Sequence, residues 1–159
     1  MDRVLLDNLV MIFALIYYAF LSIVYLLRAY ERSELELKLA PIYSLLLIPF
    51  ASLLTLNIFS GQDITRLITL IPIIIYLIYD FWYRLITRKK PVHHPKKWPI
   101  GLVVYLLLLM AGSIGLNWYG YLISKFYGHI LVAAFFVMMS FFGHYQYRYS
   151  KSIKTREPR

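Results

Sequence analysis

The sequence predicts an all-α protein, a polytopic membrane bundle of five transmembrane helices. Sixty per cent of its 159 residues are hydrophobic, whereas roughly 45–50% is usual in a soluble domain. The charged residues are concentrated in the connecting segments, and the long blocks between them carry almost none. A helix needs about 20 predominantly apolar residues to cross the bilayer core. Apolar runs of this length satisfy their backbone groups in lipid by forming helices.

Five apolar segments have this length. We expect transmembrane helices at about residues 5–28, 39–59, 64–87, 99–121 and 126–147. The first segment has neither a basic region before it nor a small-residue cleavage site after it, so we expect it to be retained and not removed as a signal peptide. Residues 1–148 would form one membrane domain, and residues 149–159 a disordered basic tail on the cytoplasmic side.

The positions of lysine and arginine predict the orientation. With five spans, the first loop, the third loop and the C-terminal tail share one side and hold three, six and five basic residues, which is 14 of the 17. Arg3, Arg66 and Lys125 lie on the other side. Basic residues in short loops favour the cytoplasm. We therefore expect a multi-pass protein of the cell (cytoplasmic) membrane, with its N-terminus outside and its C-terminus in the cytoplasm.

The charge and the cysteine count limit the partners and the chemistry. A net charge of +9 can indicate nucleic-acid binding. Beside such apolar spans, contact with anionic lipid headgroups explains it better, so lipids are the expected partners and nucleic acid is not. The absence of cysteine excludes disulfides, cysteine nucleophiles and thiolate metal sites. The expected lipid-phosphate contacts are the basic residues of the third loop: Arg88, Lys89, Lys90, Lys96 and Lys97.

Asp80 is the most informative single residue. It lies about one helical turn inside the cytoplasmic interface, where a carboxylate costs on the order of 2–3 kcal/mol at full depth. Arg84 follows four residues later on the same helix face, so the two can form a local ion pair. Alternatively, Asp80 faces the bundle interior and binds something. The helix ends are expected to bring it to the depth of other polar residues, and the candidate cluster is Glu31, Asp80, Arg84 and His144.

Two ligand chemistries are conceivable at this cluster. Histidines and carboxylates could bind a divalent metal, whereas the basic residues could hold the phosphate of a lipid headgroup or an isoprenoid. His93 and His94 are adjacent and lie between two prolines, so their side chains are expected to diverge. We therefore predict no metal site and no cofactor.

Several residues within the spans predict local packing. Pro49 and Pro72 lie mid-span and should kink their helices, or act as hinges, because each lacks the N–H that would bind a carbonyl four residues earlier. Ala111 and Gly115 are small residues four apart, which favours close helix packing within the bundle or between protomers. Polar residues near the outer ends could form a small vestibule or simple interfacial caps: Asn57, Asn117, Ser60, Gln62, Asp63, Lys125 and His129.

Three functions remain open at this level. No catalytic motif is recognisable, which favours a non-enzymatic membrane component. Such a component would bind or move a lipid or small solute, or pack with partner membrane proteins or with a second copy of itself. One alternative is a membrane-embedded enzyme acting on a lipid or isoprenoid phosphate, with Asp80 or His144 moving protons and Arg84, Lys89 and Lys90 stabilising charge. The other is an ion-coupled carrier or channel with Asp80 as its titratable group.

Overall fold

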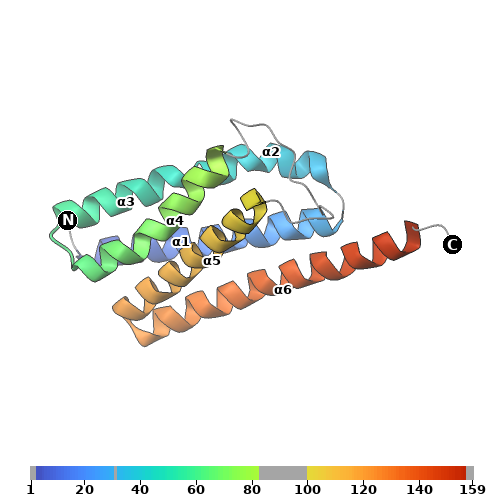
Figure 1. Cartoon of the computed structure of the whole chain (residues 1–159). Coiled ribbons are helices and arrows are strands. Elements are labelled where there is room, and N and C mark those ends of the chain that lie inside the picture. The colour runs from blue at the N-terminus through green and yellow to red at the C-terminus, as the bar shows by residue number, and fades with distance from the viewer. Residues whose placement is uncertain (1–2, 31, 83–99, 157–159) are drawn as a thin grey trace.

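The described part of the chain is a bundle of helices. The computed structural model describes residues 3–30, 32–82 and 100–156, and Figure 1 shows the helices that they form. In chain order the helices are α1 (Arg3–Ala29), α2 (Ser33–Ser44), α3 (Leu47–Phe59), α4 (Ile64–Phe81), α5 (Ile100–Ile123) and α6 (Lys125–Arg156).

Five stretches are long and apolar enough to cross a membrane: Arg3–Ala29, Ile42–Phe59, Ile64–Phe81, Val103–Ile123 and Lys125–Arg148. Large hydrophobic side chains are also exposed on the outside of all five, as Ile12, Ile48, Ile68, Leu107 and Phe136 illustrate. In water such a surface would aggregate, whereas in a bilayer it contacts lipid. The predicted all-α fold with five apolar spans is confirmed, and it is consistent with an integral membrane protein.

The second span is divided into two helices because of Pro49. The proline has no N–H to donate to the Leu45 carbonyl, and the turn at Leu45–Leu46 separates α2 from α3. The Leu45 carbonyl instead accepts a hydrogen bond from the Ile48 N–H at 3.0 Å. Pro72 has no such effect, since α4 continues through it.

The end of the chain also differs from expectation. The tail after Arg148 was predicted to be disordered, but α6 continues through Arg156. No glycine or proline interrupts this segment before Pro158, and helices usually end at or before the residue that precedes a proline.

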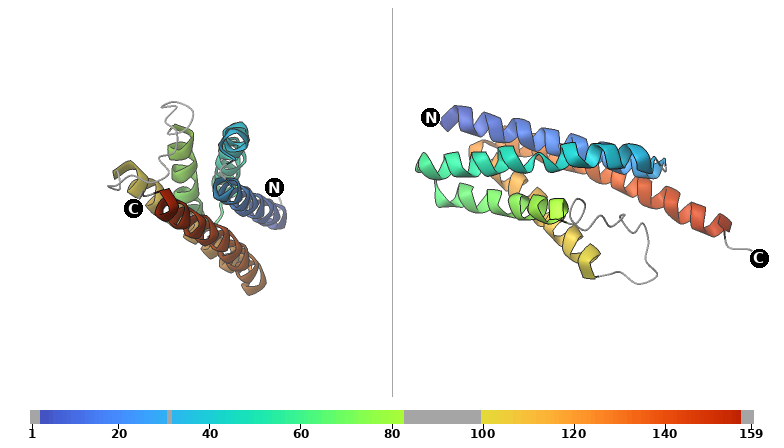
Figure 2. Two further views of the ribbon diagram at one scale, coloured as in Figure 1. Left: turned by 90° about the vertical axis from the view of Figure 1, so that its right-hand side faces the viewer. Right: turned by 90° about the horizontal axis from the view of Figure 1, so that it is seen from above.

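Successive spans run in alternating directions, so the bundle has two distinct ends (Figure 1). The starts of α1, α4 and α6 and the ends of α3 and α5 lie together, and we call this the Asp7 end. The opposite side, where α4 ends at Phe81, is the Asp80 end. Viewed along the bundle, α1 lies between α3 and α6 (Figure 2, left).

Helix α1 forms the centre of the core. Its buried residues recur every three or four positions, the spacing of one helix face. They include Leu6, Asp7, Val10, Ala14, Tyr17, Tyr18, Leu21 and Tyr25. The other spanning helices pack their own buried residues against this face.

Helices α4 and α5 are in close contact at two glycines of α5. A Cβ at Gly115 would collide with the backbone carbonyl of Thr69, and one at Gly112 would lie 3.1 Å from the Cα of Ile73. The small-residue face is therefore formed by Gly112 and Gly115 and lies within the bundle. Ala111, which the spacing had paired with Gly115, is exposed.

Candidate functional site

A buried ion pair lies at the Asp7 end. The Arg66 guanidinium of α4 binds the Asp7 carboxylate of α1 at 2.5 Å. Tyr119 of α5 donates a hydrogen bond to the same carboxylate oxygen at 3.0 Å. Arg66 also donates to the Leu122 carbonyl at 3.3 Å. Asp7 and Arg66 are only 7% and 5% exposed.

This cluster has the properties of a structural clamp. A buried ion pair is tolerated when further hydrogen bonds satisfy both partners, and Tyr119 and Leu122 supply such bonds here. The Arg66 guanidinium also lies 5.9 Å from the centre of the Tyr119 ring. The cluster thus links α1, α4 and α5 through an ion pair and hydrogen bonds.

A second polar group lies toward the Asp80 end and consists of tyrosines from four helices. Tyr43 of α2 donates to the Tyr76 hydroxyl of α4 at 2.9 Å. The hydroxyls of Tyr76 and Tyr105 of α5 are 2.8 Å apart. The Tyr17 ring of α1 stacks on Tyr43 and meets Tyr76 edge-on, with both pairs of ring centres 6.1 Å apart.

Asp80 belongs to this tyrosine group. Asp80 is 0% exposed. Tyr76 and Asp80 are four residues apart on α4, so both face the bundle interior. Asp80 is therefore buried in the bundle interior, whereas its pairing with Arg84 and the binding of a ligand there both stay predictions.

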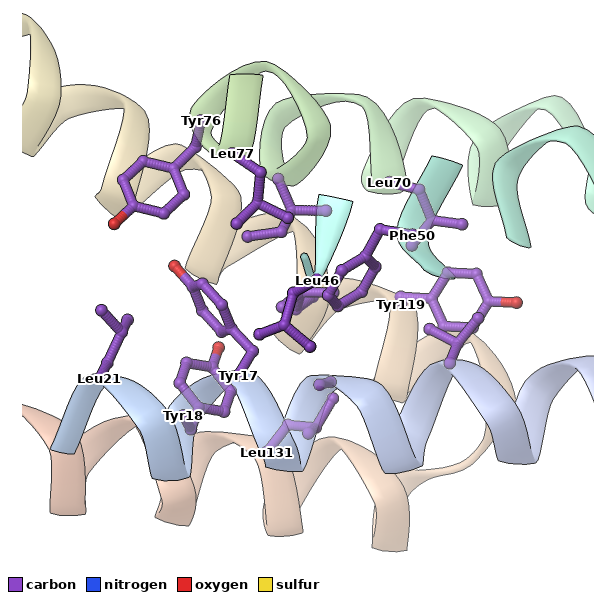
Figure 3. Packing of buried hydrophobic residues seen from close by; sticks show 14 of the residues in the cluster. Tyr17, Tyr18, Leu21, Leu46, Phe50, Leu70, Tyr76, Leu77, Tyr119 and Leu131 are labelled. Carbon is purple, nitrogen blue, oxygen red and sulfur yellow. The ribbon is translucent and has the colours of Figure 1, made fainter. Parts of the chain in front are cut away.

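Figure 3 shows how the two polar groups are separated. Tyr76 and Tyr119 lie at opposite ends of the core, with apolar side chains such as Leu46 and Phe50 between them. Tyr18 lies nearer the middle, where its hydroxyl is 3.0 Å from the Ser113 carbonyl and 2.9 Å from the Asn117 side-chain oxygen.

His144 lies in different surroundings from Asp80. It is exposed on α6, and its ring centre is 6.4 Å from that of Tyr30. Arg148 lies 4.4 Å above the same tyrosine ring. The remaining predicted residues fall outside the described ranges and stay predictions: Glu31, Arg84, Arg88, Lys89, Lys90, His93, His94, Lys96 and Lys97.

The polar residues near the Asp7 end each contact a different partner. Asn57 is buried and donates to the Leu53 carbonyl at 2.7 Å. Asn117 accepts from Tyr18, and His129 lies 3.0 Å from the Tyr121 hydroxyl. These contacts fit individual caps and helix–helix contacts better than one vestibule.

The ion pair of Asp7 and Arg66 was missed by sequence reasoning, although a signal for it exists. Asp7 shares a helix face with Val10, Ala14 and Tyr17, so the pattern places an acid on the stripe that should be buried. Arg66 similarly lies inside an apolar run. An acid and a base that each interrupt an apolar face are natural partners.

Neither a metal site nor a similar known protein indicates the function of this chain. Among residues 3–30, 32–82 and 100–156, no group of three or more His, Asp or Glu side chains is arranged to hold a metal ion. The comparisons with known proteins found no match: no family model, no curated protein and no solved structure is similar to the chain. The function must therefore be inferred from the two buried polar groups.

Proposed function

We propose that the protein is a non-enzymatic component of the cytoplasmic membrane that moves a small solute or ion, with Asp80 as its titratable group. The observation that carries this proposal is the complete burial of Asp80 beside hydrogen-bonded tyrosines in an apolar bundle. An ionisable side chain within a membrane span is costly, and such residues mark solute and proton pathways.

The hydroxyl groups near Asp80 support this choice. The surroundings of Asp80 include weakly acidic hydroxyls from α2 and α4. Hydroxyl groups both donate and accept hydrogen bonds, so they suit a site where a proton or polar solute is exchanged.

The proposal includes an orientation. The Asp80 end would face the cytoplasm, because the connections there carry most of the basic residues. The basic residues of the third loop would contact anionic headgroups. Only 17% of the α6 span is buried, against 44% of α1. Helix α6 therefore offers the largest surface for lipid, for a partner membrane protein or for a second copy.

Replacing Asp80 with asparagine should abolish transport. Purified protein is reconstituted into vesicles that contain a pH-sensitive dye, and proton entry under an imposed gradient is compared with entry into protein-free vesicles. We expect wild-type vesicles to take up protons faster, and Asp80→Asn vesicles to match the protein-free rate. Asp63→Asn is the matched control, because Asp63 is exposed at the start of α4.

Two outcomes would count against the proposal. Wild-type flux that persists in Asp80→Asn would show that the carboxylate is not needed. Proton entry into wild-type vesicles that is no faster than entry into protein-free vesicles would show that the protein does not move protons.

A further inference from the structure

A basic stripe lies on α6 at the Asp80 end and consists of His144, Arg148 and Lys151. All three residues are exposed, and their spacing of four and three residues places them on one helix face. Helix α6 contains no acidic residue over its whole length. It also extends past the end of α1 on this side of the bundle (Figure 1). The stripe therefore presents positive charge where the apolar part of the bundle ends.

Tyr30, which directly follows α1, contacts the stripe. The Arg148 guanidinium lies 4.4 Å from the centre of the Tyr30 ring, and the ring centre of His144 lies 6.4 Å from it. Arg28 at the end of α1 is paired with Glu36 at 2.6 Å, whereas no acidic side chain in the described part of the chain forms an ion pair with Arg148. The tyrosine ring orders the Arg148 guanidinium without neutralising its charge, so its N–H groups can still bind an anion.

The same face of α6 is apolar nearer the middle of the bundle. Val137, seven residues before His144, is 54% exposed, and its neighbour Phe136 is 62% exposed. Arg148 follows Val137 by eleven residues, which is about 16 Å along a helix. The hydrocarbon core of a bilayer is about 30 Å thick. This face therefore changes from apolar to basic over roughly the depth of one lipid leaflet.

We propose that this face of α6, together with Tyr30, binds one anionic phospholipid. The phosphate accepts two hydrogen bonds from the Arg148 guanidinium, whose planar shape suits a phosphate. His144 can donate a further hydrogen bond, and an acyl chain lies along Val137 and Phe136. A lipid fits better than a soluble anion because its charged and apolar parts match the two parts of the face.

The site is separate from the features discussed above. The lipid contacts expected from the sequence lie in the third loop, whereas this site is formed by α6 and the end of α1. It does not include Asp80, so it does not rest on the proposed function.

A lipid titration in mixed micelles tests the site. Purified protein in a neutral detergent receives rising fractions of phosphatidylglycerol or, in parallel, of phosphatidylcholine, and circular dichroism follows the Tm. A ligand that binds only the folded protein raises the Tm. We expect phosphatidylglycerol to raise it at lower lipid fractions than phosphatidylcholine. Equal responses to the two lipids would contradict the proposal.

Substitutions at the stripe locate the response. Arg148→Gln should require about ten times more phosphatidylglycerol for the same rise in Tm. Arg148→Lys should also weaken the response, because lysine keeps the charge but not the planar group. Lys125→Gln is the matched control, since it removes the same charge from an exposed position at the other end of α6. A wild-type response in either Arg148 variant, or a loss in Lys125→Gln as large as that in Arg148→Gln, would overturn the site.

Inorganic phosphate and Asp80→Asn complete the test. Inorganic phosphate at the same concentration should leave the Tm unchanged, and a rise as large as that with phosphatidylglycerol would show that the ligand is not a lipid. Asp80→Asn should respond to phosphatidylglycerol as the wild type does. The titration therefore decides the lipid site whatever the result of the proton-flux experiment.

Discussion

Replacing Arg66 with methionine should lower the unfolding free energy by about 3–5 kcal/mol, the usual effect of removing one partner from a buried ion pair. The substitution leaves the Asp7 carboxylate, 7% exposed, without its positive partner. It also removes the hydrogen bond to the Leu122 carbonyl. Unfolding in mixed micelles, followed by circular dichroism, measures the loss.

A double substitution separates the pair from its surroundings. Arg66→Met combined with Asp7→Asn should be less destabilising than the sum of the two single changes, because it leaves no buried charge unmatched. Arg3→Met is the control, since Arg3 is exposed near the same end of α1. If the losses of unfolding free energy in the two single variants simply add in the double variant, Asp7 and Arg66 do not act as a pair, and a stabilising role for their ion pair is contradicted.

Replacing Gly115 with leucine should cost about 3 kcal/mol, near the upper part of the range for overpacking a close contact. A side chain there would collide with the Thr69 carbonyl and push α5 away from α4. The same unfolding experiment measures the effect.

Gly143→Leu is the matched control on α6. A Cβ at Gly143 meets no atom within 4 Å, so the change should be neutral or slightly stabilising, because leucine favours a helix more than glycine. Similar losses of unfolding free energy in Gly115→Leu and Gly143→Leu would mean that the close packing of α5 against α4 at Gly115 does not cause the destabilisation.

The coarse architecture could be predicted from the sequence because a bilayer imposes simple requirements. A span needs about 20 apolar residues, and five segments of this chain meet that requirement. The effect of Pro49 followed from its missing N–H. Pro72 also lacks an N–H, but α4 accommodates it without a break, so its effect could not be predicted in the same way.

The site was harder to predict, because it depends on contacts between distant parts of the chain. Asp7 and Arg66 are 59 residues apart, and no local spacing relates them. The chain has 15 tyrosines, and tyrosine usually marks the membrane interface. The burial of Tyr43 and Tyr76 therefore could not be inferred from composition.

The close packing of α4 and α5 shows a similar limit. Spacing alone selected Ala111 and Gly115, since residues four apart share a helix face. The partner helix instead meets Gly112 and Gly115, three apart, which share a face equally well. Which pair is used depends on the direction from which α4 approaches.

The proposed function requires that the bundle crosses the membrane with the Asp80 end in the cytoplasm, and single-cysteine labelling tests this most directly. The chain has no cysteine, so one introduced cysteine is a unique reporter. Ser60, after α3, and Arg32, after α1, are exposed at opposite ends. We expect a membrane-impermeant maleimide to label Ser60→Cys in intact cells, and to label Arg32→Cys only after the membrane is opened. Labelling of both positions from outside, or of Arg32→Cys alone, would contradict this arrangement.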